Sequence, residues 1–320
     1  MTTTLSPEKR HSTRTKLKGI HPAAFEHPID RAALEVLRKT PGLPFLLKKL
    51  ASLGFERQVR IYFTADTLRL SPKQCPEIYN LLVEAAEILD MPEPELYLWQ
   101  NPFPNAFAIG MDRHTIVVTS GLVELLDEDE LQAVIAHELG HIKSGHSLYR
   151  TIAIYLAIAG LHVARNLPFV NLLSDMILYA LYDWSRKSEL TADRAGLLVV
   201  QDPAVSVRTL LKLAGGGNST IGEASTAEFL RQADDYEDMD ASPLNVLYKF
   251  ELTRFQTHPF PALRAREINQ WGASKEYQEI ISGNYRMESE NNTLRFCTSC
   301  GSRIENLAFR FCPDCGDALK

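Results

Sequence analysis

The chain lacks the apolar segment that follows a basic N-terminus in a secretory signal peptide. Residues 1–21 hold five Lys and Arg residues, all between positions 9 and 18, and few apolar ones. We expect this segment to be a basic, disordered tail, because a short run of like charges is usually solvated. With no such segment, we expect a protein that is not secreted and that is cytoplasmic, or that lies in an organelle after a transit peptide.

Cysteine is nearly absent before the C-terminus. Cys75 stands alone, and the other four of the five cysteines lie in the last 24 residues. They form two C-x-x-C pairs within an internal repeat, RFCTSCG at 295–301 and RFCPDCG at 310–316. This distribution argues against a disulfide framework and is typical of metal binding.

The repeat predicts a zinc ribbon over residues 295–320. One structural Zn²⁺ would be held by Cys297, Cys300, Cys312 and Cys315. A pair of redox-active dithiols is the alternative. A unit this small cannot build an adequate apolar core, so the metal would supply its folding free energy. Residues 275–294 show little periodicity, and we interpret them as a linker.

A large excess of positive charge is also missing. The net charge is −6, the isoelectric point is near 5.9, and 45% of the residues are hydrophobic against 23% charged. These values are those of an ordinary globular protein and argue against nucleic acid as a partner. Because the charges within residues 295–320 are mixed, we expect the ribbon to bind a protein.

No run reaches the ~20 apolar residues that a membrane-spanning helix needs. The most apolar part of the chain, residues 151–184, is interrupted by Arg165 and continues as an amphipathic pattern over 169–184. We favour a helical hairpin that is buried or that lies on a membrane surface. A tilted or partly inserted hairpin is the alternative.

What the chain does contain is an H-E-x-x-H motif, formed by His137, Glu138 and His141. Two histidines four residues apart lie on one face of an α-helix, where both can bind the same metal ion. Apolar residues at helical spacing surround the motif, and Asp127 with Glu130 predicts a capping box at the start of the helix. Glu138 can take a proton from a metal-bound water, which is the chemistry of zinc hydrolases.

A catalytic zinc ion usually has three protein ligands, so the two histidines need a partner. His146 lies five residues beyond His141, about 140° around a continuous helix, and would face away. We interpret it as a structural or helix-end residue. Glu189 fits better as the third ligand, and Asp193, one turn on, could accept the other ring N–H of a ligand histidine. Exposed acids on a charged helix face are the alternative.

Three β-type segments precede the motif, at residues 96–99, 105–109 and 115–119, and the last two are expected to form a hairpin. In zinc peptidases, a sheet edge beside the metal can bind an extended peptide by strand addition. Our candidate for this substrate strand is Asn105, Ala106, Phe107 and Ala108. A purely structural strand is the alternative.

Short helical patterns over residues 22–72 predict an N-terminal helical subdomain, in which Asp30 would cap a helix at 31–38. Pro76 then opens a longer amphipathic helix. We place the metallopeptidase domain at residues 73–274.

The motif, the string ELTADRAG that holds Glu189 and Asp193, and Thr257-His258-Pro259 followed by Arg264 resemble the HtpX and CAAX-prenyl-protease family of zinc metallopeptidases. The strand at 105–108 is similar to the pattern of that family too. The resemblance therefore covers residues 75–270 or so.

The resemblance implies metal ligation by His137, His141 and Glu189, with Glu138 as general base and then general acid. It also implies an active-site position for His258 and Arg264, where they would stabilise a tetrahedral oxyanion. Many members of that family span the membrane several times, whereas this chain has at most the short hairpin. The best-known members also lack the ribbon, so the resemblance implies nothing about its role.

These observations predict an α+β protein: a mostly helical, zincin-like metallopeptidase domain with a small β-sheet beside the motif helix, and a C-terminal zinc ribbon. We expect a zinc-dependent metalloendopeptidase of the gluzincin type that hydrolyses peptide bonds in polypeptides, with one catalytic and one structural Zn²⁺. Two alternatives remain: a non-catalytic zinc-ribbon adaptor on a peptidase-like scaffold, and a membrane-associated processing protease.

Overall fold

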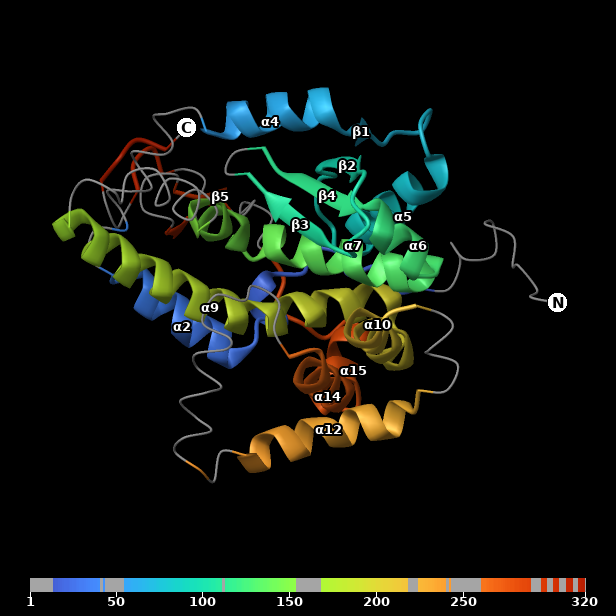
Figure 1. The fold of residues 1–320 in the computed structure, drawn as a ribbon. Helices are drawn as coiled ribbons and strands as arrows, with labels where there is room; N and C mark the ends of the chain where they lie inside the picture. The colour runs from blue at the N-terminus through green and yellow to red at the C-terminus, as the bar shows by residue number, and fades with distance from the viewer. Residues whose placement is uncertain are drawn as a thin grey trace.

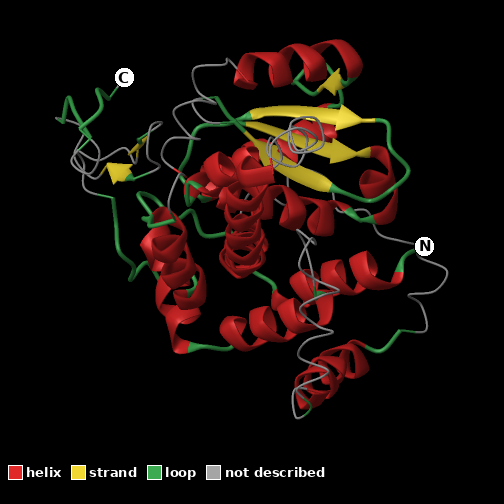
Figure 2. Cartoon of the chain, turned by 60° about the vertical axis from the view of Figure 1, so that its left-hand side comes forward, coloured by secondary structure: helices red, strands yellow, loops and turns green. Residues whose placement is uncertain are grey.

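The computed structural model describes residues 14–40, 43, 55–110, 113–153, 168–217, 224–239, 242 and 260–288, and pieces of the C-terminal tail at 295–297, 302–304, 309–312 and 316–319. Helices make up most of the regular structure and surround one four-stranded sheet (Figures 1 and 2). This arrangement confirms the predicted α+β class.

The main sheet has the strand order β1-β2-β4-β3. Its strands are β1 (Leu68–Arg69), β2 (Glu95–Trp99), β3 (Ala106–Ile109) and β4 (Thr115–Thr119). β3 and β4 pair antiparallel, whereas β2 and β4 pair parallel. The predicted strands and the hairpin are therefore confirmed, and β3 forms one edge of this sheet.

The helices pack on both sides of this sheet. In chain order they are η1 (Pro22–Ala24), α2 (Pro28–Arg38), α4 (Phe55–Asp66), α5 (Pro76–Ile88), α6 (Ser120–Leu125), α7 (Glu128–Lys143), α9 (Pro168–Val200), α10 (Pro203–Gly215), α12 (Thr226–Asp238), α14 (Pro261–Gly272) and α15 (Lys275–Ile281). α7 lies between the sheet and α9, and α2 packs on α9 in turn (Figure 1).

Both faces of the sheet are covered, and all five residues of β4 are buried. On one face, Phe63 of α4 packs near Val117. On the other, Ile116 and Val118 join the main core with residues of α5 and α7. Because successive side chains of a strand point to opposite faces, β4 contributes to both helical layers.

Helix α7 begins as the sequence predicts. The Asp127 carboxylate accepts a hydrogen bond from the Glu130 N–H, and the Glu130 carboxylate accepts one from the Asp127 N–H, each at 3.0 Å. This capping box satisfies two backbone donors that a helix start would otherwise leave without a partner. The helix ends at Lys143, and Gly145 follows with a φ of 74°.

The expectation of a disordered tail is wrong for residues 14–20. Leu17 and Ile20 are fully buried in the main core. The Leu17 N–H donates to the carbonyl of Ile88, and Arg14 pairs with Asp129. Leu17 and Ile20 anchor this segment in the core, although its Lys and Arg residues are typical of a solvated tail. Residues 1–13 lie outside the described part.

The helix that we expected at residues 31–38 begins earlier. α2 starts at Pro28, and His27 caps it by accepting a hydrogen bond from the Ile29 N–H at 3.3 Å. Asp30 therefore lies inside the first turn, and its side chain is buried. The expected separate subdomain at 22–72 is also wrong, because α2 packs on α9 while α4 packs beside the sheet.

The predicted linker is wrong over residues 275–288. Residues 275–281 form α15, which Ser274 caps, and its Tyr277 and Ile280 are buried in the main core. Met287 then forms a β-bridge with Ile20. A helix of two turns offers too few apolar positions for its periodicity to be evident in the sequence. Residues 289–294 lie outside the described part.

Part of the apolar segment 151–184 contributes buried side chains, at residues 151–153 and on one face of residues 177–184. Together with neighbouring residues, its side chains form a second core with α2 that contains Leu34, Leu37, Tyr149, Ile152, Ile177, Leu181 and Trp184. Residues 154–167 lie outside the described part. Among the helices that are described, none is both long enough and apolar enough to cross a membrane.

In the C-terminal tail, β5 (Arg295–Phe296) pairs antiparallel with β6 (Arg303–Ile304). The two described cysteines repeat one local geometry: the Cys297 N–H donates to the carbonyl of Ser302, and the Cys312 N–H donates to that of Asp317. Both cysteines are buried beside Ile304. Cys300 and Cys315 lie outside the described residues.

The cap of α2 predicts a pH-dependent stability. Burial, aided by Arg194, lowers the pKa of His27 from 6.5 to about 4. Between these values the folded chain binds fewer protons than the unfolded chain, so stability present above pH 6.5 is lost as the pH falls towards 4. Because only one proton is involved, the unfolding free energy falls by at most about 1.4 kcal/mol per pH unit.

His27→Asn should flatten this part of the stability profile, because asparagine can cap a helix but does not titrate. The measurement is urea unfolding of both proteins at several pH values from 4 to 7. The difference in unfolding free energy between them should change with pH in that window. A difference that is independent of pH would contradict the assigned role of His27.

Candidate metal centre

The site lies where α7 crosses α9, and the crossing is unusually close. A Cβ atom added to Gly140 would lie 2.5 Å from the Cβ of Ala195, and one on Gly196 would lie 3.0 Å from the carbonyl oxygen of Ala133. Real Cβ atoms do not tolerate the first distance, so glycine at position 140 lets the two helices approach. This approach brings residues of α9 next to the motif on α7.

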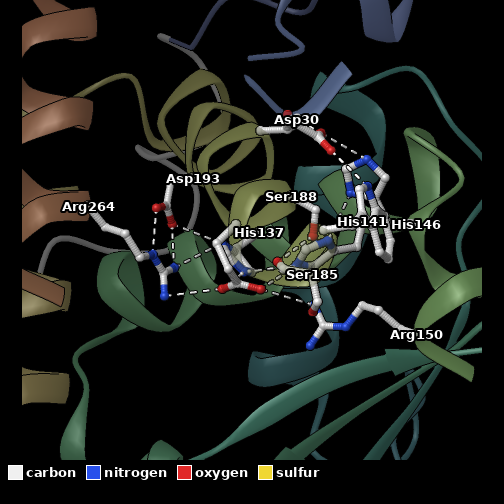
Figure 3. Close-up of polar contacts among 12 residues, drawn as sticks. Asp30, His137, His141, His146, Arg150, Ser185, Ser188, Asp193 and Arg264 are labelled. Atoms are coloured by element: carbon white, nitrogen blue, oxygen red, sulfur yellow. Dashed lines mark hydrogen bonds and ion pairs between the residues drawn. The ribbon is translucent and has the colours of Figure 1, made fainter. Parts of the chain in front are cut away.

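Three side chains from the two helices converge at this crossing (Figure 3). The Nε2 atoms of His137 and His141 are 3.2 Å apart. The Glu189 carboxylate faces both, with 3.3 Å from Oε2 to Nε2 of His137 and 3.3 Å from Oε1 to Nε2 of His141. The structure thus brings together the three residues that the sequence singles out as ligands.

These separations fit a tetrahedral metal site. When metal–ligand bonds are ~2.0 Å long, neighbouring ligand atoms of a tetrahedron are about 3.3 Å apart. The three distances of 3.2–3.3 Å match that edge length. Two imidazoles and one carboxylate are also a common ligand set of catalytic zinc. The residues present therefore fit the metal.

Glu189 is fully buried, and two arginines hold it in place. Arg264 Nη1 lies 3.1 Å from Oε2, and Arg150 Nη1 lies 3.4 Å from Oε1. A buried carboxylate without such partners would lose its charge. Arg150 could not be predicted from the sequence, because nothing in its local spacing links it to a residue 39 positions away.

His137 is held from its other ring nitrogen. Its Nδ1 lies 3.0 Å from Oδ1 of Asp193. Arg264 donates two hydrogen bonds to the same carboxylate, from Nε at 2.7 Å and from Nη2 at 2.6 Å. Burial by itself raises the pKa of Asp193, but Arg264 and His137 outweigh this effect and lower it. The ionised carboxylate accepts the Nδ1 proton of His137, which leaves Nε2 with a free electron pair for a metal.

The two histidines of the motif differ in their electrostatic surroundings. Burial by itself lowers the pKa of His137, but Glu189 and Asp193 raise it to about 9. By contrast, burial and then Arg150 lower the pKa of His141 well below 6.5. Glu189 and Asp193 therefore favour positive charge at His137, whereas burial and Arg150 disfavour it at His141.

Glu138 has the position expected of a general base. Its carboxylate lies with His137 and His141 in a group whose ligand atoms are within 4.8 Å of one another. Glu138 is buried, and its Oε2 has no hydrogen-bond partner among the described residues. A buried carboxylate oxygen without a protein partner is suited to bind a water molecule.

A cavity of about 220 Å³ opens beside Glu138. Asn105, which precedes β3, and Ala106, the first residue of β3, line it, and so do Leu210 and Leu213 of α10. The candidate substrate strand and the candidate base therefore face one cavity.

On a continuous helix His146 would face away from the site. In the structure it instead faces His141. α7 ends at Lys143, Gly145 turns the chain with a positive φ, and a new helical segment begins at His146. Nδ1 of His146 lies 3.1 Å from Nδ1 of His141. The prediction failed because it assumed an unbroken helix, although Gly145 is a typical signal for a helix end.

Of the two remaining site residues that the sequence predicts, Arg264 and His258, the structure describes only Arg264. Arg264 points into the site from α14, and its guanidinium contacts Glu189 and Asp193 (Figure 3). His258 lies outside the described residues.

Comparison with known proteins gives consistent results. A sequence profile described as peptidase family M48 matches residues 72–272. A plastoglobule-localized metallopeptidase 48 from Arabidopsis thaliana, described as chloroplastic, is 40% identical over 259 residues, which are 80% of this chain and 74% of the relative. A protease HtpX homolog from Helicobacter pylori is 31% identical over 229 residues, 62% of this chain and 67% of the relative.

The helix crossing yields a prediction for Gly140→Ala. The added methyl group overlaps Ala195, which costs about 1–3 kcal/mol, and this exceeds the gain of about 1 kcal/mol in helix propensity. α9 must shift, and Glu189 with it, so both the unfolding free energy and the zinc affinity should fall. Gly215→Ala is the matched control, since nothing lies within 4 Å of its added Cβ. Equal stability and equal zinc affinity of Gly140→Ala and the wild type would contradict this packing argument.

Proposed function

This chain belongs to peptidase family M48, and on that premise we propose that it is a zinc metalloendopeptidase whose metal is held by His137, His141 and Glu189. As a metallopeptidase, it acts on polypeptides. The observation that carries the choice of zinc and of these ligands is the triangle of ligand atoms with edges of 3.2–3.3 Å. Its edges match a tetrahedral ion with ~2.0 Å bonds.

A zinc ion bound by these residues supplies Lewis acidity towards a water molecule and towards the peptide carbonyl. Glu138 binds the water through its unpartnered oxygen, accepts the proton as the water attacks the carbonyl, and passes the proton to the leaving amine. Asp193 and Arg264 keep the proton of His137 on Nδ1 and the Glu189 carboxylate ionised.

The substrate binds as an extended strand along the outer edge of β3, at Asn105, Ala106, Phe107 and Ala108. Two observations support this part of the proposal. β3 is an edge strand of the described sheet, and Asn105 and Ala106 line the cavity beside Glu138. Backbone hydrogen bonds to an edge strand bind polypeptides with little regard to sequence.

Arg264 and His258 take different parts in this proposal. The contacts of Arg264 with Glu189 and Asp193 favour a role in positioning these carboxylates over the oxyanion role that the family resemblance implied. The oxyanion role is assigned to His258, on the strength of that resemblance.

The C-terminal tail is proposed to bind a second, structural zinc ion through Cys297, Cys300, Cys312 and Cys315, and to bind a protein partner. The supporting observation is that Cys297 and Cys312 are buried in one cluster and that each donates its backbone N–H to the carbonyl of the residue five positions on. Four thiolates from two C-x-x-C pairs are the ligand set of a zinc ribbon.

For location, we propose a cytoplasmic protein, with attachment of residues 151–184 to a membrane surface as the alternative. The packing of Ile152, Leu181 and Trp184 inside the second core supports the first. The printed name of the Arabidopsis relative, plastoglobule-localized, concerns that protein.

The function is tested by Glu138→Gln. Removing the carboxylate takes away the proton acceptor but none of the three ligands, so peptide hydrolysis should fall by about 10²–10⁴-fold while the zinc content stays at two ions per chain. Activity is measured on an unfolded protein such as casein, and zinc by atomic emission.

Two control variants separate the roles. Glu124→Gln removes an exposed carboxylate from α6 and should leave activity and zinc unchanged. Cys297→Ser should lower the zinc content by one ion. Activity of Glu138→Gln close to that of the wild type, or loss of a zinc ion from this variant, would contradict the role of Glu138.

A further inference from the structure

His141 has a neighbour that the catalytic scheme does not use. Nδ1 of His146 lies 3.1 Å from Nδ1 of His141, and Nε2 of His146 lies 3.1 Å from Oδ2 of Asp30. Figure 3 shows His146 between Asp30 and His141. The second contact is close enough for an ion pair, although it lacks the angle of a straight hydrogen bond. All three side chains are buried.

The contacts determine where the protons of both rings lie. His141 can bind a metal through Nε2 only if its proton is on Nδ1. Nδ1 of His146 must then accept this proton, which leaves the proton of His146 on Nε2. That proton then lies on the ring nitrogen that is 3.1 Å from the Asp30 carboxylate. The opposite arrangement would set an unprotonated nitrogen against a carboxylate oxygen and would place the proton of His141 where the metal binds.

Asp30 is itself held by neutral donors. Thr191 Oγ1 donates to its Oδ2 at 2.5 Å, and Trp184 Nε1 donates to its Oδ1 at 3.0 Å. Burial by itself raises the pKa of Asp30, but His146, Thr191 and Trp184 outweigh this effect and lower it. A carboxylate that is buried, ionised and oriented by two donors is suited to fix the tautomer of a neighbouring imidazole.

We propose that Asp30 and His146 act in series as positioning residues for the metal, holding His141 with its proton on Nδ1 and its Nε2 towards the ion. The proposal rests on the proposed function, since it assumes that His141 is a ligand. Asp193 holds His137 directly, whereas Asp30 holds His141 through a second imidazole. Because Asp30 belongs to α2, outside the matched residues 72–272, the N-terminal helix becomes part of the metal site.

The test is the zinc affinity of the full-length metal-free chain, measured by competition with a chromophoric chelator. Asp30→Asn retains the shape of the side chain but offers one acceptor oxygen to three donors, so one donor meets the amide NH₂. His146→Phe removes the acceptor for His141 and keeps a ring in place. Each variant should bind zinc about 10–100-fold more weakly, as is typical when the partner of a ligand histidine is lost.

A double-variant comparison separates positioning from general damage. If Asp30 acts only through His146, Asp30→Asn combined with His146→Phe should bind zinc as weakly as His146→Phe alone. His146→Asn, whose amide oxygen takes the place of Nδ1, should bind more tightly than His146→Phe. Glu130→Gln is the matched control: it removes another buried carboxylate, paired with Lys212, and should lower stability without changing zinc affinity.

Zinc affinity of Asp30→Asn within twofold of the wild type would overturn the proposal. The proposal would also be overturned if the factors by which the two single variants weaken zinc binding multiplied in the double variant. If Asp30→Asn does not fold, as judged by circular dichroism, the comparison of His146→Asn with His146→Phe decides, and equal affinities would overturn the proposal. Failure of the wild type to bind zinc at His137 and His141 would instead refute the proposed function.

Discussion

The site depends on one buried charge, the carboxylate of Glu189. Burial disfavours an ionised carboxylate, yet only the ionised form can complete a metal site with two imidazoles. Arg264 and Arg150 provide the compensating charge, one at each oxygen. The close contact of α7 with α9, which Gly140 permits, brings this carboxylate to 3.3 Å from both histidines. The metal site thus follows from the packing of two helices.

Each of the two proposed ligand histidines is linked to a carboxylate, His137 directly and His141 through His146, and the two carboxylates come from different parts of the chain. Asp193 shares α9 with Glu189, so one helix supplies both a ligand and the partner of another ligand. Asp30 comes from α2 and reaches the site through His146. Trp184, which donates to Asp30, belongs to the second core, in which α2, the segment after α7 and residues 177–184 of α9 pack together.

The sequence predicted those features that depend on local spacing. His137 and His141 share a helix face, Asp127 and Glu130 form the capping box, and Glu189 and Asp193 lie one turn apart. The strands that flank the hairpin also followed from alternation and composition. Each of these relations joins residues a few positions apart, where helix and strand geometry fixes the distance.

Features that depend on distant contacts could not be predicted in this way. The contact of Asp30 with Thr191 spans 161 positions, and no spacing rule relates them. His146 was misplaced because the rule was applied across a helix end at Lys143. The segment at 275–281 was taken for a linker because only two of its side chains, Tyr277 and Ile280, are buried.

The most direct test of the metal site is diffraction from crystals of the zinc-loaded protein, with data collected on both sides of the zinc absorption edge. We predict an anomalous peak about 2.0–2.2 Å from Nε2 of His137, Nε2 of His141 and a carboxylate oxygen of Glu189. A zinc ion bound at the two histidines with Glu189 turned away, or no zinc ion between them, would contradict the account.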